Sequence, residues 1–258
     1  MRATQAINNS IEAKMHFDLT GWVVTETLNS TQVEELQHAV DEVQSWGSSV
    51  NCLNHFEMTK DGAKLCRTEY FTPFHEGLKK LLTKGEVLAM ASTLLGEQAV
   101  LYKEKINYKL SGGAGWNPHQ DAPAYPFINR HVSCMIAVDD STIENGCLEI
   151  VSGAHGELLA MDKNSCIQSS VVEAMKWQPI ELRAGQTMWF HSLTPHRSAD
   201  NKSDNDRRAL YPTFNALREG DLREDYYRLK IEEFEKHSQT GDEVRLSLID
   251  DFRGKKVK

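Results

Sequence analysis

Apolar and polar positions in the first hundred residues predict a short strand followed by several helices. Trp22-Val23-Val24 follows Gly21 and is typical of a strand. From Ser30, the expected N-cap, apolar residues recur at helical spacing until Gly47, where we expect the helix to end. Residues 51–70 have no clear period and predict a hairpin or a loop. Residues 75–82 and 84–95 predict two more helices.

The pattern changes to strands after residue 99. Residues 100–110 alternate, with three lysines and an asparagine on one face: Lys103, Lys105, Asn107 and Lys109. A polar inner face is costly unless it meets a ligand, so an anionic ligand would explain this face, although we expect Lys103 to be solvated. Further strands are predicted at 130–138, 147–151, 187–191 and 208–215, and a charged helix at 221–237. Residues 158–177 form a polar insertion that we expect to act as a lid near the site. The sequence thus predicts a mainly β barrel core wrapped by helices.

Composition narrows the class of protein. The chain has 258 residues, 40% hydrophobic and 26% charged, which predicts one domain spanning residues 1–258. The net charge is −8 without a basic stripe, so we expect no nucleic-acid partner. The absence of a long apolar run predicts no membrane span, and residues 1–15 lack an apolar signal core. Five widely spaced cysteines predict free thiols and a cytoplasmic location.

The segment around His119 and Asp121 carries the strongest chemical signal. These two residues are separated by one position, so on an extended strand both side chains point to the same side. Glycines at 112, 113 and 115 precede the pair. A second histidine, for which His196 has a better context than His155, would complete a set of two imidazoles and one carboxylate. Such a set binds Fe(II) and leaves positions open for a co-substrate and dioxygen.

Arg207 follows His196 by eleven residues. A buried guanidinium at that position could hold the distal carboxylate of 2-oxoglutarate through a pair of parallel hydrogen bonds. The three metal ligands and the arginine together predict a 2-oxoglutarate-dependent site.

The motifs taken together resemble the phytanoyl-CoA dioxygenase family over roughly residues 15–220. The resemblance is carried by His119-x-Asp121, the run from Asn145 to His155, His196-x-Ser198 and Arg207. It implies a double-stranded β-helix and an Fe(II)- and 2-oxoglutarate-dependent dioxygenase that hydroxylates its substrate and releases succinate and carbon dioxide. The carboxylate at Asp121 implies hydroxylation and not halogenation. Ser198 is then expected to assist Arg207, and Lys105 or Asn107 to hold the proximal end of 2-oxoglutarate.

Within the family, three segments are most similar to 2-aminoethylphosphonate dioxygenases: 105–109, 119–125 and 208–223. The resemblance implies conversion of 2-aminoethylphosphonate to 2-amino-1-hydroxyethylphosphonate. We expect Lys109 and Arg67 to meet the phosphonate, and a carboxylate or aromatic face from Glu69, Tyr70 or Tyr125 to meet the ammonium. For Arg67 the alternative is a surface salt bridge with Glu69.

Other functions compatible with the residues are hydroxylation of a different small zwitterion, such as an amino acid or a betaine-like solute, and a non-catalytic metal-binding β-barrel. The second alternative would not need Arg207 or an open coordination position.

Overall fold

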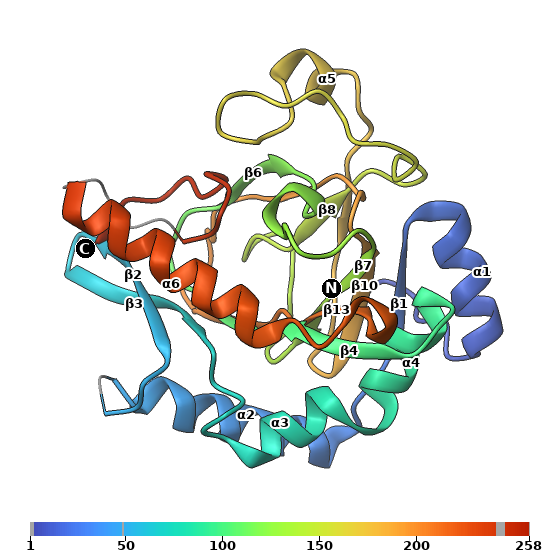
Figure 1. Ribbon diagram of the computed structural model, residues 1–258, viewed down its shortest axis with the longest axis horizontal. Coiled ribbons are helices and arrows are strands. Elements are labelled where there is room, and N and C mark those ends of the chain that lie inside the picture. The colour runs from blue at the N-terminus through green and yellow to red at the C-terminus, as the bar shows by residue number, and fades with distance from the viewer. Residues whose placement is uncertain (1–2, 48, 241–245, 258) are drawn as a thin grey trace.

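Two antiparallel sheets form the centre of the molecule (Figure 1). The computed structural model describes residues 3–47, 49–240 and 246–257. Within this part of the chain, one sheet has ten strands and the other has four, in the order β6-β11-β8-β9. This is the predicted double-stranded β-helix with helices around it.

The strands that build the two sheets are short. Their bounds are β1 Trp22–Glu26, β2 Leu53–Thr59, β3 Gly62–Glu69, β4 Ala99–Lys103, β5 Lys105–Lys109, β6 Trp116–His119, β7 His131–Ala137, β8 Leu148–Ile150, β9 Gln178–Ile180, β10 Gln186–His191, β11 His196–Ser198, β12 Arg207–Leu210, β13 Thr213–Ala216 and β14 Lys256–Val257. The hairpin predicted in 51–70 is confirmed as β2 and β3. The single strand predicted at 208–215 is two strands, because β12 ends before Pro212, which cannot donate to a ladder.

The helices are α1 Ser10–Thr20, α2 Ser30–Ser45, α3 Glu76–Thr83, α4 Gly85–Leu95, α5 Ser169–Glu173 and α6 Arg223–Thr240, with 3-10 turns at Ala122–Ala124 and Leu217–Glu219. The cap of α2 is Asn29 and not Ser30: its side chain accepts from the backbone N–H of Gln32, whose side chain accepts from the N–H of Asn29. No helix in the described ranges has the length and apolarity to cross a membrane.

Two apolar clusters stabilise the barrel. Between the sheets, side chains from β1, β7, β10 and β12 pack against those of β8 and β9, including Met135, Leu148 and Phe190. On the outer face of the large sheet, α1 to α4 pack through residues such as Leu36, Leu94 and Trp189. Figure 1 shows α2, α3 and α4 along one side of the barrel, with the segment that carries α5 at the opposite end. All five cysteines are free.

Burial corrects the prediction for one lysine. Lys103 was expected on a solvated face, but its side chain is buried, with 4% exposed. The chain switches from β4 to β5 at Glu104, whose carboxylate is held by Arg223 of α6 and by the hydroxyl of Thr72. Lys103 and Lys105 lie on either side of this break, and both side chains line a common cavity.

Candidate active site

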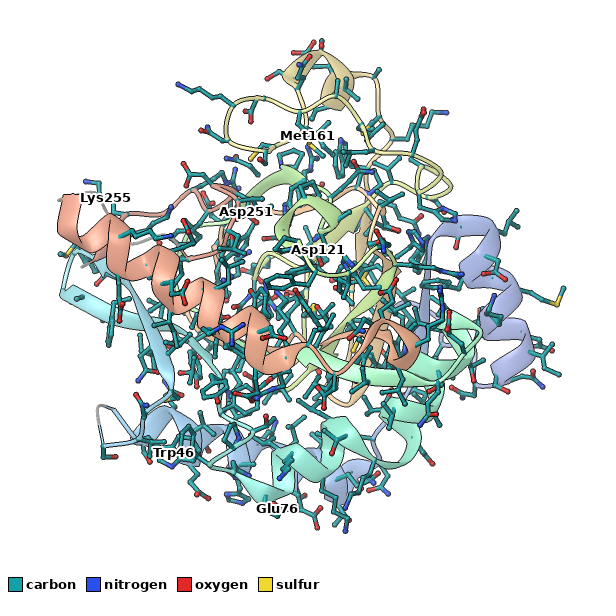
Figure 2. All side chains as sticks on the ribbon, viewed as in Figure 1. Trp46, Glu76, Asp121, Met161, Asp251 and Lys255 are labelled. Atoms are coloured by element: carbon teal, nitrogen blue, oxygen red, sulfur yellow. The ribbon has the colours of Figure 1, made fainter. Side chains whose placement is uncertain are left out.

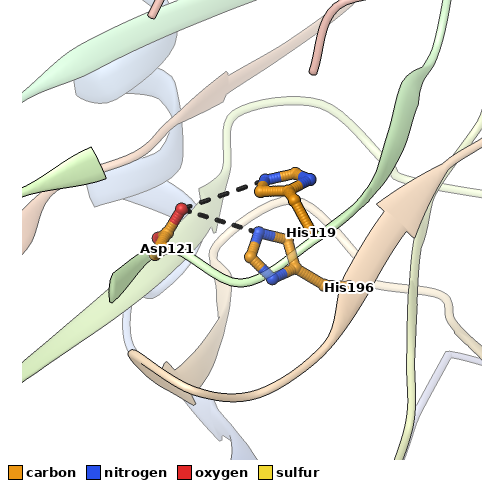
Figure 3. Close-up of side chains that lie close together, drawn as sticks. All are labelled: His119, Asp121 and His196. Carbon is orange, nitrogen blue, oxygen red and sulfur yellow. Dashed lines mark ion pairs between the residues drawn. The ribbon is translucent and has the colours of Figure 1, made fainter. Parts of the chain in front are cut away.

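His119, Asp121 and His196 are brought together by strand pairing. His119 ends β6 and His196 begins β11, and the two residues are direct partners across this antiparallel pair. Their imidazole centroids are 4.2 Å apart. Asp121 does not lie on the strand as the sequence predicted, because its backbone is helical (φ −73°, ψ −25°) at the start of the 3-10 turn. The turn brings its carboxylate toward both rings (Figure 3).

The ligand atoms of the three side chains converge on one position that suits a metal ion. Their ligand atoms all lie within 4.8 Å of one another. Asp121 Oδ1 is 3.9 Å from Nε2 of His119 and 3.8 Å from Nε2 of His196. Each histidine donates its Nδ1–H to a backbone carbonyl, that of Asn117 at 2.6 Å and that of Thr194 at 2.9 Å. In the neutral rings both Nε2 atoms therefore carry a lone pair that can coordinate a metal, and this donor set fits ferrous iron.

Electrostatics keep the ligands in the protonation states that a metal needs. Burial tends to raise the pKa of the Asp121 carboxyl, but its interactions with the imidazole of His196 and the ammonium of Lys103 hold it well below its usual range. Burial lowers the pKa of His196 to about 4, so its imidazole is neutral near pH 7. The second oxygen of Asp121 accepts a hydrogen bond from Ser133 Oγ at 2.8 Å. Ser133 thus fixes the carboxylate orientation, a role that the sequence analysis missed.

His155 lies outside this group, as expected. Its ring packs 5.4 Å from that of His191, and a side chain at Gly21 would collide with it. His191 Nδ1 accepts from the backbone N–H of Leu193. Both residues stabilise the junction between α1 and β10.

A second cavity beside the metal ligands contains Arg207. The guanidinium is buried, with 3% exposed, and its Nε and Nη1 have no hydrogen-bond partner, although Nη2 donates to the Gly146 carbonyl at 3.2 Å. Burying unpartnered donors costs free energy unless a ligand accepts from them. The two neighbouring arginines are already occupied: Arg197 by Glu149 and Arg208 by Asp139. The free donors of Arg207 fit the distal carboxylate of 2-oxoglutarate.

Lys109 belongs to this same cavity. It pairs with Arg207 across β5 and β12, and its Nζ donates to Ser198 Oγ at 2.9 Å and to the carbonyl of Gly146 at 3.0 Å. Burial, followed by repulsion from Arg207, lowers the pKa of Lys109 to about 6. Lys109 and Ser198 therefore lie with Arg207, the candidate residue for holding the co-substrate. Lys109 was expected instead to meet the phosphonate of the substrate. Asn107 lies between this cavity and the metal ligands, and its side-chain oxygen accepts from Arg67 Nε.

The opposite side of the metal ligands is strongly cationic. Four basic side chains line this chamber: Arg67, Lys103, Lys105 and Lys230. Glu69 is the carboxylate that neutralises part of this charge, with Oε1 2.6 Å from Lys230 Nζ and 3.4 Å from Arg67 Nη1. Within the described residues, the ammonium group of neither Lys103 nor Lys105 makes an ion pair or a hydrogen bond. Their ammonium groups lie over the rings of Tyr125 at 4.3 Å and Tyr211 at 5.3 Å.

The two unpaired lysines are poorly solvated. Burial lowers the pKa of Lys103, and burial together with repulsion from Lys103 lowers the pKa of Lys105 well below its usual value. A bound dianion would raise the pKa of both lysines. This chamber, referred to below as the cationic chamber, therefore has a lining that suits an anionic group.

The other expected substrate residues lie at different depths. Arg67 is buried, with 1% exposed, so its salt bridge with Glu69 is present but does not lie on the surface. Glu69 is also buried, and its Oε1 is occupied by cations of the protein. Tyr125 lines the cationic chamber, whereas the Tyr70 hydroxyl donates to Glu224 at 2.7 Å, away from the metal ligands.

Two further residues of the site come from the C-terminal segment 246–257. Asp251 lines both the metal cavity and the cationic chamber, and its Oδ2 is 3.2 Å from His119 Nε2. The carbonyl of Leu246 accepts from Arg67 Nη1 at 2.6 Å. Nothing in the sequence Leu248-Ile249-Asp250-Asp251-Phe252 signals a site; only the tertiary pairing of this segment with β6 brings it there.

The expected lid segment, 158–177, lies over the outer side of β6. Ile167 N–H donates to the carbonyl of Pro118, and the amide of Gln120 donates to the carbonyl of Glu157. Figure 2 shows Met161 on this segment above Asp121. The segment thus contacts the strand that carries His119, whereas its role as a lid stays a prediction.

Comparisons with known proteins agree on the type of fold and chemistry. A model of the phytanoyl-CoA dioxygenase family matches residues 17–209. The chain is 44% identical over 240 residues to the methylphosphonate hydroxylase of Gimesia maris, covering 92% of each. It is 38% identical over 213 residues to the 2-aminoethylphosphonate dioxygenase of an uncultured bacterium, covering 80% of this chain and 81% of that protein. Among solved structures, EctD from S. alaskensis with 2-oxoglutarate and 5-hydroxyectoine superposes with a TM-score of 0.73 at 16% identity, covering 84% of this chain and 80% of that one.

Proposed function

Because the chain belongs to the phytanoyl-CoA dioxygenase family and is an Fe(II)- and 2-oxoglutarate-dependent dioxygenase, we propose that it hydroxylates 2-aminoethylphosphonate at the carbon next to phosphorus. The products would be 2-amino-1-hydroxyethylphosphonate, succinate and carbon dioxide. When bound, iron and 2-oxoglutarate supply the activation of dioxygen. The alternative of a non-catalytic metal-binding barrel no longer applies, because the chain is an enzyme.

In this proposal the protein holds each reactant in a separate part of the site. His119, Asp121 and His196 hold the iron. Arg207, supported by Lys109 and Ser198, holds the distal carboxylate of 2-oxoglutarate, while Asn107 faces its proximal end. Lys105 was expected to hold 2-oxoglutarate. We assign it to the substrate instead, because it lines the cationic chamber together with Lys103.

The observation that carries the proposal is the cationic chamber next to the metal ligands. A phosphonate dianion needs several charged donors, and the unpaired lysines 103 and 105 offer them within reach of Asp121. Four cations face three carboxylates there (Glu69, Asp121 and Asp251), which leaves a net charge of +1, and bound Fe(II) would add +2, so a phosphonate dianion is accommodated. The charged and polar side chains that line the metal cavity suit a small anionic substrate better than an acyl-coenzyme A thioester.

A second candidate is methylphosphonate, because the Gimesia maris relative is 44% identical over nearly the whole chain. The same cations would bind its phosphonate group. The two candidates differ in the ammonium group, which methylphosphonate lacks.

A substrate panel tests the proposal. Enzyme with Fe(II), 2-oxoglutarate and dioxygen is given 2-aminoethylphosphonate, methylphosphonate or 3-aminopropionate, the carboxylate analogue, and succinate is measured against the His196→Ala variant. We expect 2-aminoethylphosphonate to stimulate succinate release most strongly and the carboxylate least. Equal turnover of the carboxylate would favour the different-zwitterion alternative, and stimulation by neither phosphonate would refute the proposal.

A further inference from the structure

Asp251 is a buried carboxylate whose charge no described lysine or arginine neutralises through an ion pair. Its side chain is about 6% exposed, and its contacts are the Ser247 hydroxyl, which donates to Oδ1 at 2.8 Å, and Nε2 of His119. A buried carboxylate without a directly paired cation is costly, so a ligand that brings a positive charge would stabilise it. Of the other two carboxylates near the chamber, Glu69 already has two cationic partners and Asp121 belongs to the metal-binding group.

The backbone holds Asp251 firmly in this position. Its carbonyl accepts from Asn117 N–H at 2.7 Å, and Arg253 N–H donates to the Gly115 carbonyl at 3.1 Å. The next residue, Phe252, packs on Trp116 with ring centroids 4.7 Å apart. The segment thus runs antiparallel beside β6, the strand that carries His119, and Figure 2 shows Asp251 near the middle of the molecule.

A role as a fourth metal ligand does not fit this geometry. The ligand atoms of His119, Asp121 and His196 lie within 4.8 Å of one another, and Asp251 is not part of that group. When a metal occupies Nε2 of His119, the contact between that nitrogen and Asp251 is no longer available as a hydrogen bond. The carboxylate then faces the space between the metal and Lys103 and Lys105, where the substrate would lie.

We infer that Asp251 binds the ammonium group of the substrate and thereby makes the enzyme select aminoalkylphosphonates over phosphonates without an amine. The inference rests on the proposed function. The lysines 103 and 105 hold the phosphonate at one end, and Asp251 on the facing segment holds the ammonium at the other. The carbon next to phosphorus is left between these anchors, toward the metal ligands.

The test compares two substrates of similar size in matched variants. Propylphosphonate replaces the ammonium of 2-aminoethylphosphonate by a methyl group. The readout is the ratio of kcat/KM for 2-aminoethylphosphonate to that for propylphosphonate, measured in wild type, Asp251→Asn and Asp250→Asn. Asp250 is the adjacent carboxylate, whose partner is Lys256 at 2.6 Å. Iron content and the calorimetric affinity for 2-aminoethylphosphonate under anaerobic conditions are measured on the same samples.

We expect the ratio to fall about 10- to 100-fold in Asp251→Asn, as for loss of a charge-assisted hydrogen bond, and to stay at the wild-type value in Asp250→Asn. The calorimetric affinity should fall with it, at unchanged iron content. A ratio within threefold of wild type in Asp251→Asn, an equal fall in Asp250→Asn, or loss of iron would overturn the inference. Wild-type enzyme that oxidises neither phosphonate would instead contradict the proposed function itself.

Discussion

At the scale of single residues, the site depends on three side chains whose other contacts are already fixed. The Nδ1 atoms of His119 and His196 donate to backbone carbonyls, and Ser133 fixes Asp121. The ligand geometry is therefore set before iron binds, which reduces the cost of ordering the ligands.

The ligand assignment predicts the effect of single substitutions on iron content. His119→Ala and Asp121→Ala should lose stoichiometric Fe(II) and turnover, because two ligands do not hold the ion. Anaerobic titration with Fe(II) and 2-oxoglutarate, followed by visible absorption and by iron analysis, measures this loss. His155→Ala serves as the control, since that ring lies outside the group, and should keep its iron. Tight stoichiometric iron in either ligand variant would refute the assignment.

Arg207 predicts a selective effect on the co-substrate. Arg207→Lys keeps the charge but loses the planar pair of donors, so the KM for 2-oxoglutarate should rise about 10- to 100-fold, with a much smaller change for the phosphonate. Steady-state kinetics with each substrate varied in turn measures both constants. The matched control is Arg208→Lys on the same strand, whose guanidinium is held by Asp139. An unchanged dependence on 2-oxoglutarate would show that another group is the anchor.

At the scale of elements, the sequence predicted individual helices, strands and motifs better than the contacts between distant segments. The histidine pair, the arginine and most helices and strands follow from local spacing. The break between β4 and β5 does not follow from local spacing, because Glu104 at the break is held by Arg223 from the distant helix α6. Asp251 was not predicted for the same reason: its segment reaches the site only by pairing with β6.

Close packing around β6 predicts that Gly115 tolerates no side chain. A Cβ atom at this position would lie 2.1 Å from the backbone oxygen of Ser198 and 2.1 Å from the guanidinium of Arg253. Gly115→Ala should therefore displace β6 from β11 and lower the free energy of unfolding by about 1–3 kcal/mol, together with the affinity for iron. Urea unfolding and iron titration measure the two effects.

Gly156→Ala is the control for this prediction, because a Cβ atom there meets nothing within 4 Å. It should change the free energy of unfolding by less than about 0.5 kcal/mol. If both alanine variants behave alike, the strand contact at Gly115 is not as close as described.

At the scale of the whole molecule, buried histidines set the response of stability to acid. His131 is buried, with no hydrogen-bond partner on either ring nitrogen. Burial lowers its pKa from 6.5 to about 3. The unfolded chain therefore takes up the proton first as pH falls, so stability from this group is complete above pH 6.5 and is lost progressively toward pH 3.

His131→Phe should remove this acid sensitivity while keeping a ring of similar size. Between pH 7.5 and 5.5, the iron-free wild type should lose about 1.4 kcal/mol more of its free energy of unfolding than the variant. Urea unfolding in the presence of a chelator at both pH values measures the difference. Parallel pH profiles would mean that His131 is not buried in its neutral form.

In the proposed function, the whole site combines a candidate metal centre, a candidate co-substrate cavity and the cationic chamber in one barrel. Its most direct test is the phosphorus NMR spectrum of 2-aminoethylphosphonate after turnover with Fe(II), 2-oxoglutarate and dioxygen, with succinate measured in the same sample. We predict one new resonance, from the hydroxylated phosphonate, in a one-to-one ratio with succinate. Succinate formed without any change in the phosphorus spectrum would contradict the account.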